Sequence, residues 1–202
     1  MADEYKTIDK KIGEGRVTEK RSKFLAFAHY VTDSEQVRDI INDYRKRYHD
    51  ARHVCFAYIL GPEQTEFRAF DDGEPSSTGG KPILGRIKSL DLTDVLVVVV
   101  RYYGGANLGT SLLAQCYRDA AEQALADSNV VTKIVEEVVT VTVSYAATDK
   151  IIKIANQEGA RIRDMQSDMQ CTFTLPVAKS KTELLCEKIR KNVPDAQIFL
   201  PK

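Results

Sequence analysis

Apolar and polar positions alternate with two different periods along the chain, and the changes of period outline its elements. Alternation over residues 16–31 predicts two strands with an interruption around 20–22. Apolar residues then recur at helical intervals up to about Tyr48, and Thr32 with Glu35 has the spacing of a capping box at the start of this helix. Beyond it the pattern predicts two strands, a polar loop and a short helix, over 54–60, 66–70, 71–82 and 83–90.

The most apolar segment of the chain, residues 94–101, reads DVLVVVVR. Because it is β-branched and apolar on both faces, it is typical of a central buried strand. A glycine-rich turn over 104–109 and a helix over 111–126 follow it. The longest unbroken apolar run, 95–100, is far shorter than the roughly 18 residues needed to span a bilayer. The charged N-terminal segment lacks the apolar region of a secretory signal, so we expect a cytoplasmic protein that has no membrane partner.

The last third of the chain has its own order of elements. Its pattern predicts strand, helix, strand, strand, helix and strand, over 135–145, 149–158, 161–165, 170–175, 180–192 and 196–200. Gly159 ends the first helix, and Ser180 with Glu183 gives a second capping box at the other. The order βαββαβ is that of the split-βαβ, ferredoxin-like unit, for which we expect four antiparallel strands with both helices on one face. The fold class is therefore α+β with two domains, a mixed domain over 1–132 and a ferredoxin-like domain over 133–202.

Charge and cysteine content narrow the functional classes. Lys and Arg total 29 and Asp and Glu total 29, so the chain lacks the strongly basic balance that announces nucleic-acid binding. Two basic clusters, at 20–23 and 45–47, are typical of solvated faces, although a basic groove assembled in three dimensions stays compatible with the sequence. The four cysteines form no CxxC pair and the chain has three histidines, so we expect reduced thiols, no metal site and no cofactor.

The first polar loop, residues 71–82, reads DDGEPSSTGGKP. Its glycines allow close approach of the backbone, so successive N–H groups can form an anion-binding nest, to which the hydroxyls and the lysine add donors. Its three carboxylates argue against an anion site, because they repel a phosphate unless Mg²⁺ lies between them or they point away from it. The alternative is a surface loop that caps the following helix. The candidate binding residues of this loop are Asp72, Glu74, Ser76, Thr78, Gly80 and Lys81.

The second loop links the buried strand to the next helix, within the segment VVVVRYYGGANLGTSLLAQCYRDA, 97–120. Backbone N–H groups at the N-terminus of a helix favour an anion, and Arg101 at the strand end can bind phosphate through two hydrogen bonds. The alternative is that Thr110 or Ser111 caps the helix and the glycines only turn the chain. If both loops form one site, the candidates of the first lie beside those of the second, which are Arg101, Tyr102, Gly104, Gly105, Gly109 and Thr110.

Two strands carry residues for which the sequence allows either a structural or a functional role. Arg101 leaves a strand that is apolar on both faces, so its charge must reach solvent, a ligand or a carboxylate. An internal salt bridge to Asp72 or Glu74 competes with a contact to RNA, and we expect the RNA contact. His53 and Cys55 share one face of a strand, where side chains at i and i+2 stand about 6–7 Å apart. A buried structural pair is therefore favoured over a catalytic Cys–His pair.

Both loops are similar to the motifs of a known family. Segments 72–82 and 101–117 resemble the DGEPSGTAGKP and RYFGG.KLGTGGL..AY motifs of the Impact family, including its bacterial YigZ-type members, and ARHVCFAY at 51–58 resembles a third segment. The likeness covers essentially the whole chain. It implies a first domain with the fold shared by domain IV of elongation factor G, a ribosomal small-subunit protein domain and the GHMP kinases. It implies a ferredoxin-like second domain similar to elongation factor G domains III and V.

The resemblance also implies a function in binding. Both folds occur in ribosome-associated and RNA-binding proteins, and the eukaryotic Impact protein restrains a translation-control kinase by competing for that kinase's activator. We therefore expect a non-enzymatic binding protein linked to the regulation of translation, which meets RNA, a ribosome or a protein partner through the two loops. One alternative is a pure protein-interaction module. The other is a phosphotransfer or hydrolase enzyme, with GGANLGTS as a GHMP-kinase-like phosphate loop and Mg²⁺ held by Asp71, Asp72 and Glu74.

The sequence departs from the family motifs at three positions. Ser77 replaces a glycine in the first loop. Asn107 and Gln115 stand where many members carry Lys and Arg, and the loss of these two charges weakens the expectation that the loops bind phosphate.

Overall fold

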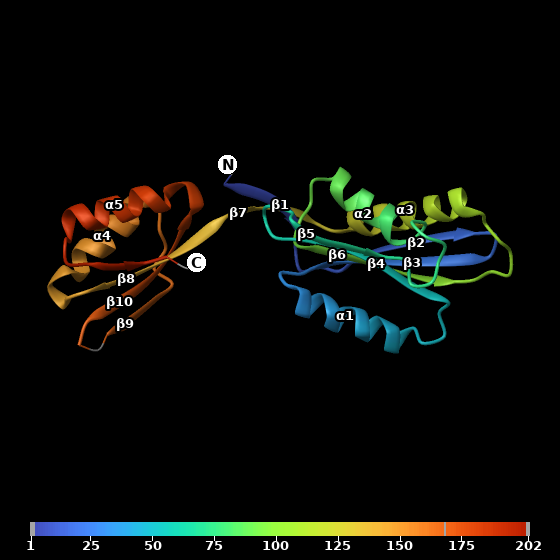
Figure 1. Cartoon of the computed structure of the whole chain (residues 1–202), viewed down its shortest axis with the longest axis horizontal. Coiled ribbons are helices and arrows are strands. Elements are labelled where there is room, and N and C mark those ends of the chain that lie inside the picture. The colour runs from blue at the N-terminus through green and yellow to red at the C-terminus, as the bar shows by residue number, and fades with distance from the viewer. Residues whose placement is uncertain (1–2, 168, 201–202) are drawn as a thin grey trace. The chain divides into compact units, whose positions relative to one another are not determined.

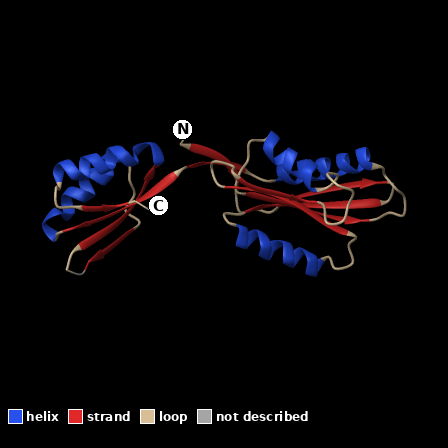
Figure 2. Cartoon of the chain, viewed as in Figure 1, coloured by secondary structure: helices blue, strands red, loops and turns tan. Residues whose placement is uncertain are grey.

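The computed structural model describes residues 3–167 and 169–200, with helices and strands throughout (Figure 2). It divides into two compact units: an N-terminal unit, Tyr5–Lys133, and a C-terminal unit that begins at Ile134 and also includes Asp3 and Glu4. The expected α+β class with two domains is confirmed. No helix in the described part of the chain is long and apolar enough to cross a membrane.

A five-stranded antiparallel sheet forms the middle of the N-terminal unit. Its strands, in spatial order, are β2 (Gly13–Glu19), β3 (Ser22–Tyr30), β6 (Val95–Tyr102), β4 (His53–Leu60) and β5 (Glu66–Phe70). β6 is the predicted segment DVLVVVVR, and residues 95–100 have no exposure to solvent. A strand that is apolar on both faces needs cover on both sides.

Helices provide that cover on both faces of the sheet (Figure 1). α1 (Ser34–Arg47) packs on one face, and α2 (Gly80–Ser89) and α3 (Thr110–Asp127) pack on the other. Because side chains alternate along a strand, Val97 and Val99 join the core under α2 and α3, whereas Val98 and Val100 join the core under α1. The same alternation decides which side chains at the end of β6 reach a common site.

The cap of α1 differs by one residue from the predicted capping box. The N-cap is Asp33, whose carboxylate accepts the backbone N–H of Gln36 at 2.9 Å. The Gln36 side chain in turn accepts the backbone N–H of Thr32 at 3.2 Å. The predicted capping box of Thr32 with Glu35 is therefore wrong, because Asp33 and Gln36, each one residue further along the chain, make the capping contacts.

Two short strands were missed by the sequence pattern. β1 (Glu4–Ile8) and β7 (Val130–Ile134) form a two-stranded sheet. Half-buried and exposed residues alternate in β7, so no fully buried apolar face marks it as a strand.

The C-terminal unit has the element order βαββαβ. Its antiparallel sheet has the spatial order β11 (Gln197–Phe199), β8 (Glu136–Val143), β10 (Cys171–Ala178) and β9 (Asp164–Ser167). The helices α4 (Thr148–Glu158) and α5 (Thr182–Asn192) lie together on one face of this sheet (Figure 1). Ile151 and Ile189 from the helices and Phe173 from β10 share one core there.

Of the two caps predicted for these helices, one is present in the structure and the other is not. Gly159 ends α4 in the left-handed region at φ 73°, as expected of a glycine C-cap. The predicted capping box of Ser180 with Glu183 is wrong. Residues Lys179–Lys181 form a 3₁₀ turn ahead of α5, and the Ser180 hydroxyl bonds to Asp3 instead.

Candidate binding cleft

A cleft of about 580 Å³ opens in the N-terminal unit, where β4 begins and β6 ends. Its walls come from the start of β4, the first polar loop and the turn from β6 into α3. Antiparallel pairing sets His53 directly opposite Arg101 at the cleft. Among the residues that line it are Arg52, His53, Glu74, Arg101, Tyr103, Asn107, Gly109 and Thr110.

A buried ion pair forms the floor of the cleft. Glu74 Oε1 accepts a hydrogen bond from Arg101 Nη1 at 2.6 Å, and the two side chains are 3% and 6% exposed. The Tyr117 hydroxyl donates to the same carboxylate oxygen at 2.7 Å. The internal salt bridge is therefore the arrangement that the structure contains, and the expectation that Arg101 reaches outward to RNA is not supported by its contacts.

The guanidinium of Arg101 is held in place by aromatic rings as well as by its acid. It lies 5.3 Å from the centroid of Phe24 and 5.6 Å from that of Tyr103. Its Nε is buried and has no hydrogen-bond partner among the described residues. A buried donor without an acceptor is uncommon, so this nitrogen marks the cleft wall as a place where polar contacts are incomplete.

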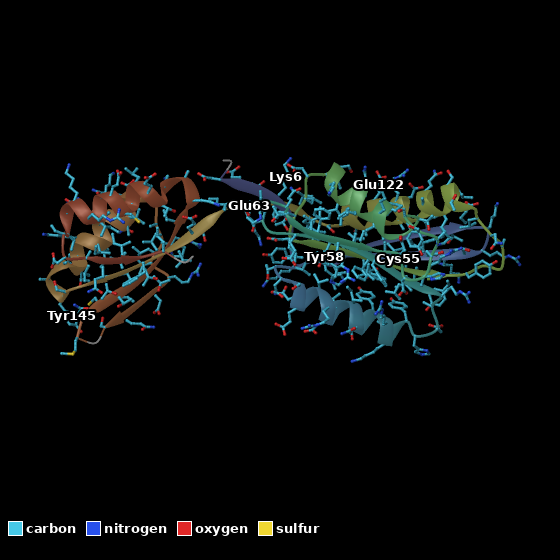
Figure 3. The ribbon with its side chains drawn as sticks, in the orientation of Figure 1. Lys6, Cys55, Tyr58, Glu63, Glu122 and Tyr145 are labelled. Carbon is cyan, nitrogen blue, oxygen red and sulfur yellow. The ribbon has the colours of Figure 1, made fainter. Side chains whose placement is uncertain are left out.

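His53 was considered from the sequence only as a partner of Cys55 and not as a residue of the binding site, yet it lines the cleft beside the ion pair. Its Nδ1 donates to the backbone carbonyl of Asp72 at 2.7 Å, which leaves Nε2 facing Glu74 Oε2 at 3.7 Å. Cys55, labelled on β4 in Figure 3, is fully buried instead. Its Sγ lies 3.0 Å from the carbonyl of Asp71 and 3.2 Å from the hydroxyl of Tyr117. Burial raises the pKa of the Cys55 thiol far above its usual range, so this thiol packs as a neutral group.

The three carboxylates of the first loop point to different partners. Asp71 accepts the backbone N–H groups of Ser77, Gly79 and Gly80 at 2.8–2.9 Å, and so organises the turn into α2. Asp72 accepts the N–H of Val54 at 2.7 Å and pairs with Arg45. Because Glu74 is engaged by Arg101, the arrangement expected for Mg²⁺ is not formed, and the described residues contain no group of three His, Cys, Asp or Glu able to hold a metal.

The remaining candidates of the first loop serve its own packing. A Cβ on Gly80 would lie 2.3 Å from the backbone nitrogen of Phe70, so glycine is required here by close approach. The Thr78 hydroxyl donates to the carbonyl of Pro75 at 2.6 Å and is buried. Ser76 and Lys81 are exposed and do not line the cleft. The alternative of a loop that caps α2 describes this segment better than an anion-binding nest.

In the second loop, the glycines allow close backbone contact and positive φ, whereas the start of α3 lines the cleft. A Cβ on Gly104 would lie 2.2 Å from the backbone of Arg21, so the strand ends touch there. Gly105 and Gly109 have φ of 86° and 75°, which favours glycine. Gly109 is the N-cap of α3 and makes no side-chain cap, so neither predicted hydroxyl closes the helix, and Thr110 begins it at the cleft.

Tyr102 does not share the cleft with Arg101. Neighbouring residues of a strand point to opposite faces, and Tyr102 packs against the core under α1 while its hydroxyl donates to Asp50 at 2.9 Å. Four of the twelve candidates therefore line one cleft, namely Glu74, Arg101, Gly109 and Thr110. The others lie outside it, namely Asp72, Ser76, Thr78, Gly80, Lys81, Tyr102, Gly104 and Gly105.

A second hollow of about 390 Å³ adjoins the cleft across one residue. Tyr103 lines both, and its side chain is 48% exposed. The hollow is otherwise lined by the ends of β2, β3 and β6, with Arg16, Arg21, Lys23, Leu25 and Tyr102. Part of the basic cluster at 20–23, interpreted from sequence as a solvated face, thus stands beside two tyrosines.

The Impact N-terminal domain family model matches residues 20–125, which include both loops and the cleft. The IMPACT family member YigZ of Escherichia coli is 32% identical over 164 residues, covering 79% of this chain and 80% of that protein. The chain belongs to the Impact family. The IMPACT family member YvyE of Bacillus subtilis is 27% identical over 187 residues, covering 93% of this chain and 86% of that protein. A solved structure described as a hypothetical protein shares the fold, with a TM-score of 0.75 and 23% identity over 100% of this chain and 99% of that chain.

One departure of this Impact family chain from the motif, Ser77 in place of a glycine, has a conformational consequence. Ser77 occupies a left-handed conformation at φ 64°. That region suits the glycine of the family motif and strains a residue with a Cβ. The Ser77 backbone N–H still donates to Asp71 at 2.9 Å, so the loop keeps its shape around the substitution.

Proposed function

We propose that this Impact family chain is a translation-linked binding protein whose N-terminal unit binds single-stranded RNA across the cleft and the adjoining hollow. The observation that carries the proposal is Tyr103, a half-exposed aromatic ring that lines both depressions. Proteins that bind single strands combine a positive groove along the backbone with aromatic rings on which bases stack. The hollow lies on the α1 face of the sheet and the cleft on the α3 face, and Tyr103 is the residue that lines both, so a strand would pass from one to the other over its ring.

The cleft offers contacts for a phosphate group. Arg52 is exposed at its wall and makes no ion pair among the described residues, so its charge is free for an anion. The N-terminus of α3 opens at the same wall, with no acidic residue in its first turn and no side-chain cap. Backbone N–H groups and the helix dipole favour a phosphate oxygen there. The charge of the buried Arg101 is balanced by Glu74, so Arg101 holds the floor of the cleft in place and is not proposed to bind the phosphate itself.

The hollow supplies the rest of the footprint. Arg16, Arg21 and Lys23 are exposed and surround Tyr102 and Tyr103, so a strand that leaves the cleft over Tyr103 meets three positive side chains. Their contacts with phosphates are independent of sequence, and stacking on tyrosine accepts any base. The neutral charge of the whole chain is compatible with this local surface, since binding depends on the patch and not on the total.

The link to translation rests on membership of the Impact family, for which the resemblance of the two loop motifs implies a role in the regulation of translation. The carboxylates that a Mg²⁺-dependent phosphotransfer would use are engaged with the backbone, with Arg45 and with Arg101. The contacts in the cleft therefore support binding as its task.

Fluorescence anisotropy with a labelled single-stranded RNA of about 12 nucleotides tests the proposal, since such sites span roughly 4–16 nucleotides. Tyr103→Ala should weaken binding by about 5- to 150-fold, which corresponds to the roughly 1–3 kcal/mol of one stacked base. Phe67→Ala is the matched control, because Phe67 is equally exposed, at 50%, on β5. Arg21→Gln should lower the slope of log affinity against log salt by about 0.7.

Two results would overturn this proposal. Equal RNA affinity of Tyr103→Ala and Phe67→Ala would remove the cleft and hollow from the binding surface. Absence of RNA binding by the unmodified protein at low salt would leave the protein-interaction module as the better interpretation.

A further inference from the structure

The C-terminal unit carries a basic groove of its own. A depression of about 490 Å³ is lined by residues of both α4 and α5, and Ile154 of the shared core contributes to it. It is lined by Lys150, Lys153, Ile154, Gln157, Lys188, Lys191 and Asn192. None of the described residues that line it is acidic.

The helical period explains why four lysines meet here. Lys150 and Lys153 are three residues apart on α4, and Lys188 and Lys191 are three apart on α5. Residues at that spacing lie on one helix face, about 4.5 Å apart along the axis. The helices α4 and α5 lie together on one face of the sheet (Figure 1). The two lysine pairs, one from each helix, line the same depression.

Most of this charge is not balanced within the chain. Lys188 pairs with the buried carboxylate of Glu158. Lys150, Lys153 and Lys191 are exposed and make no ion pair among the described residues. Three positive charges in the groove therefore have no acidic partner in the part of the chain that the structure describes.

We propose that this groove binds the phosphate backbone of RNA and so gives the protein a second, sequence-independent contact. Lysine is a compact point charge that binds phosphate without demanding one geometry, and the amides of Gln157 and Asn192 add further donors. This inference rests on the proposed function only in the choice of polymer, because its residues and its unit of the fold are different.

The composition of the groove favours RNA over an acidic protein. Protein–protein interfaces are depleted in lysine and depend on buried aromatic or apolar anchors. Here the apolar lining is Ile154, which is only 7% exposed, and none of the described lining residues is aromatic. Interfaces with nucleic acids are, in contrast, polar and strongly positive.

The test compares two charge-matched triple variants of the full chain. Lys150→Gln, Lys153→Gln and Lys191→Gln together remove the groove charges and leave the Lys188–Glu158 pair intact. Lys10→Gln, Lys46→Gln and Lys88→Gln remove the same charge from exposed positions outside the groove. Anisotropy with the same single-stranded RNA is measured across a salt series, with circular dichroism to confirm that each variant is folded.

The groove variant should lower the salt slope by about 2, since each single-strand phosphate contact contributes about 0.7. Extrapolated from 1 M salt, this corresponds to a loss of up to about 100-fold in affinity near 0.1 M. Replacing the same three lysines with arginine should retain the slope, because the charge is kept. The loss should be similar for RNAs of different sequence.

Several outcomes separate this inference from the proposed function. If the groove variant and the control variant have equal slopes while Tyr103→Ala still weakens binding, the groove inference is overturned and the cleft proposal stands. If the groove variant loses slope while Tyr103→Ala changes nothing, the reverse holds. A loss confined to one RNA sequence would also contradict a contact with the backbone.

Discussion

Removal of one partner from the buried pair of Arg101 and Glu74 should strongly destabilise the N-terminal unit. The informative change is Arg101→Met, which keeps much of the side-chain volume and removes the charge. Glu74 would then hold a carboxylate that is 3% exposed, with the Tyr117 hydroxyl as its remaining hydrogen-bond donor. Burial of a charge without its counter-ion is unfavourable because the protein interior solvates it poorly.

The size of the effect follows from the geometry of the pair. At 2.6 Å and an effective dielectric constant near 20, the attraction between the two charges is about 6 kcal/mol, most of which offsets desolvation. Breaking such pairs from one side typically lowers the free energy of unfolding by about 3–5 kcal/mol. For a unit of roughly 130 residues, this corresponds to a fall in melting temperature of roughly 10–20 °C.

The composition of the chain provides a selective assay. It has no tryptophan, and Tyr145 is the one tyrosine of nine outside Tyr5–Lys133. Urea unfolding followed by tyrosine fluorescence therefore reports mainly on the N-terminal unit. The double variant Arg101→Met with Glu74→Gln should be more stable than Arg101→Met alone, because it leaves no unpaired charge.

Arg86→Met is the matched control. Arg86 pairs with Glu122, labelled on α3 in Figure 3, at 2.7 Å, but these side chains are 26% and 49% exposed. Solvent screens this pair, so its loss should change the free energy of unfolding by less than about 1 kcal/mol. Equal effects of Arg86→Met and Arg101→Met would refute the argument that burial gives the Arg101 pair its importance.

Two further predictions concern the same unit. Ser77→Gly should raise the free energy of unfolding by about 0.5–1 kcal/mol, because relief of left-handed strain outweighs the added chain entropy of glycine. Ser76→Gly, at a position without positive φ, should lower the free energy of unfolding. Urea unfolding of both variants tests this, and the absence of a gain for Ser77→Gly would contradict it. The raised pKa of Cys55 means that its thiol ionises in the unfolded chain, near its ordinary value of 9.0, before it does so in the folded one. Stability from this group is thus complete below that pH and is lost as pH rises, so between pH 9 and 10.5 the unmodified protein should lose up to about 1.4 kcal/mol per pH unit more than Cys55→Ala does. Parallel pH profiles for the two proteins would show that the thiol ionises equally in both states.

The elements with a strong period were predictable from the sequence, and the pairings between them were not. DVLVVVVR defined the central strand, and the repeat of apolar residues placed the helices on either side of it. β7 was missed because it has no fully buried face. The capping boxes failed because several acid, amide and hydroxyl side chains compete for the same N–H groups, and local spacing alone does not decide among them.

The candidate site was found only in part for a related reason. Arg101 and Glu74 could be proposed from two motifs, but His53 enters the cleft through its antiparallel register opposite Arg101, which local sequence does not reveal. Alternation along β6 would have separated Tyr102 from Arg101 and would have assigned Tyr103 to the cleft. Glycines such as Gly80 resemble a phosphate loop in sequence, although close approach to Phe70 explains Gly80 in the structure.

The most direct test of RNA binding by the N-terminal unit is ultraviolet crosslinking of single-stranded RNA to the full chain, followed by identification of the modified residues by mass spectrometry. The proposed function predicts that Tyr103 carries the crosslink, with Tyr102 as the neighbouring position, and that Arg52→Gln reduces its yield. Crosslinks confined to aromatic residues outside the cleft and hollow, such as Phe67 on β5, would contradict it.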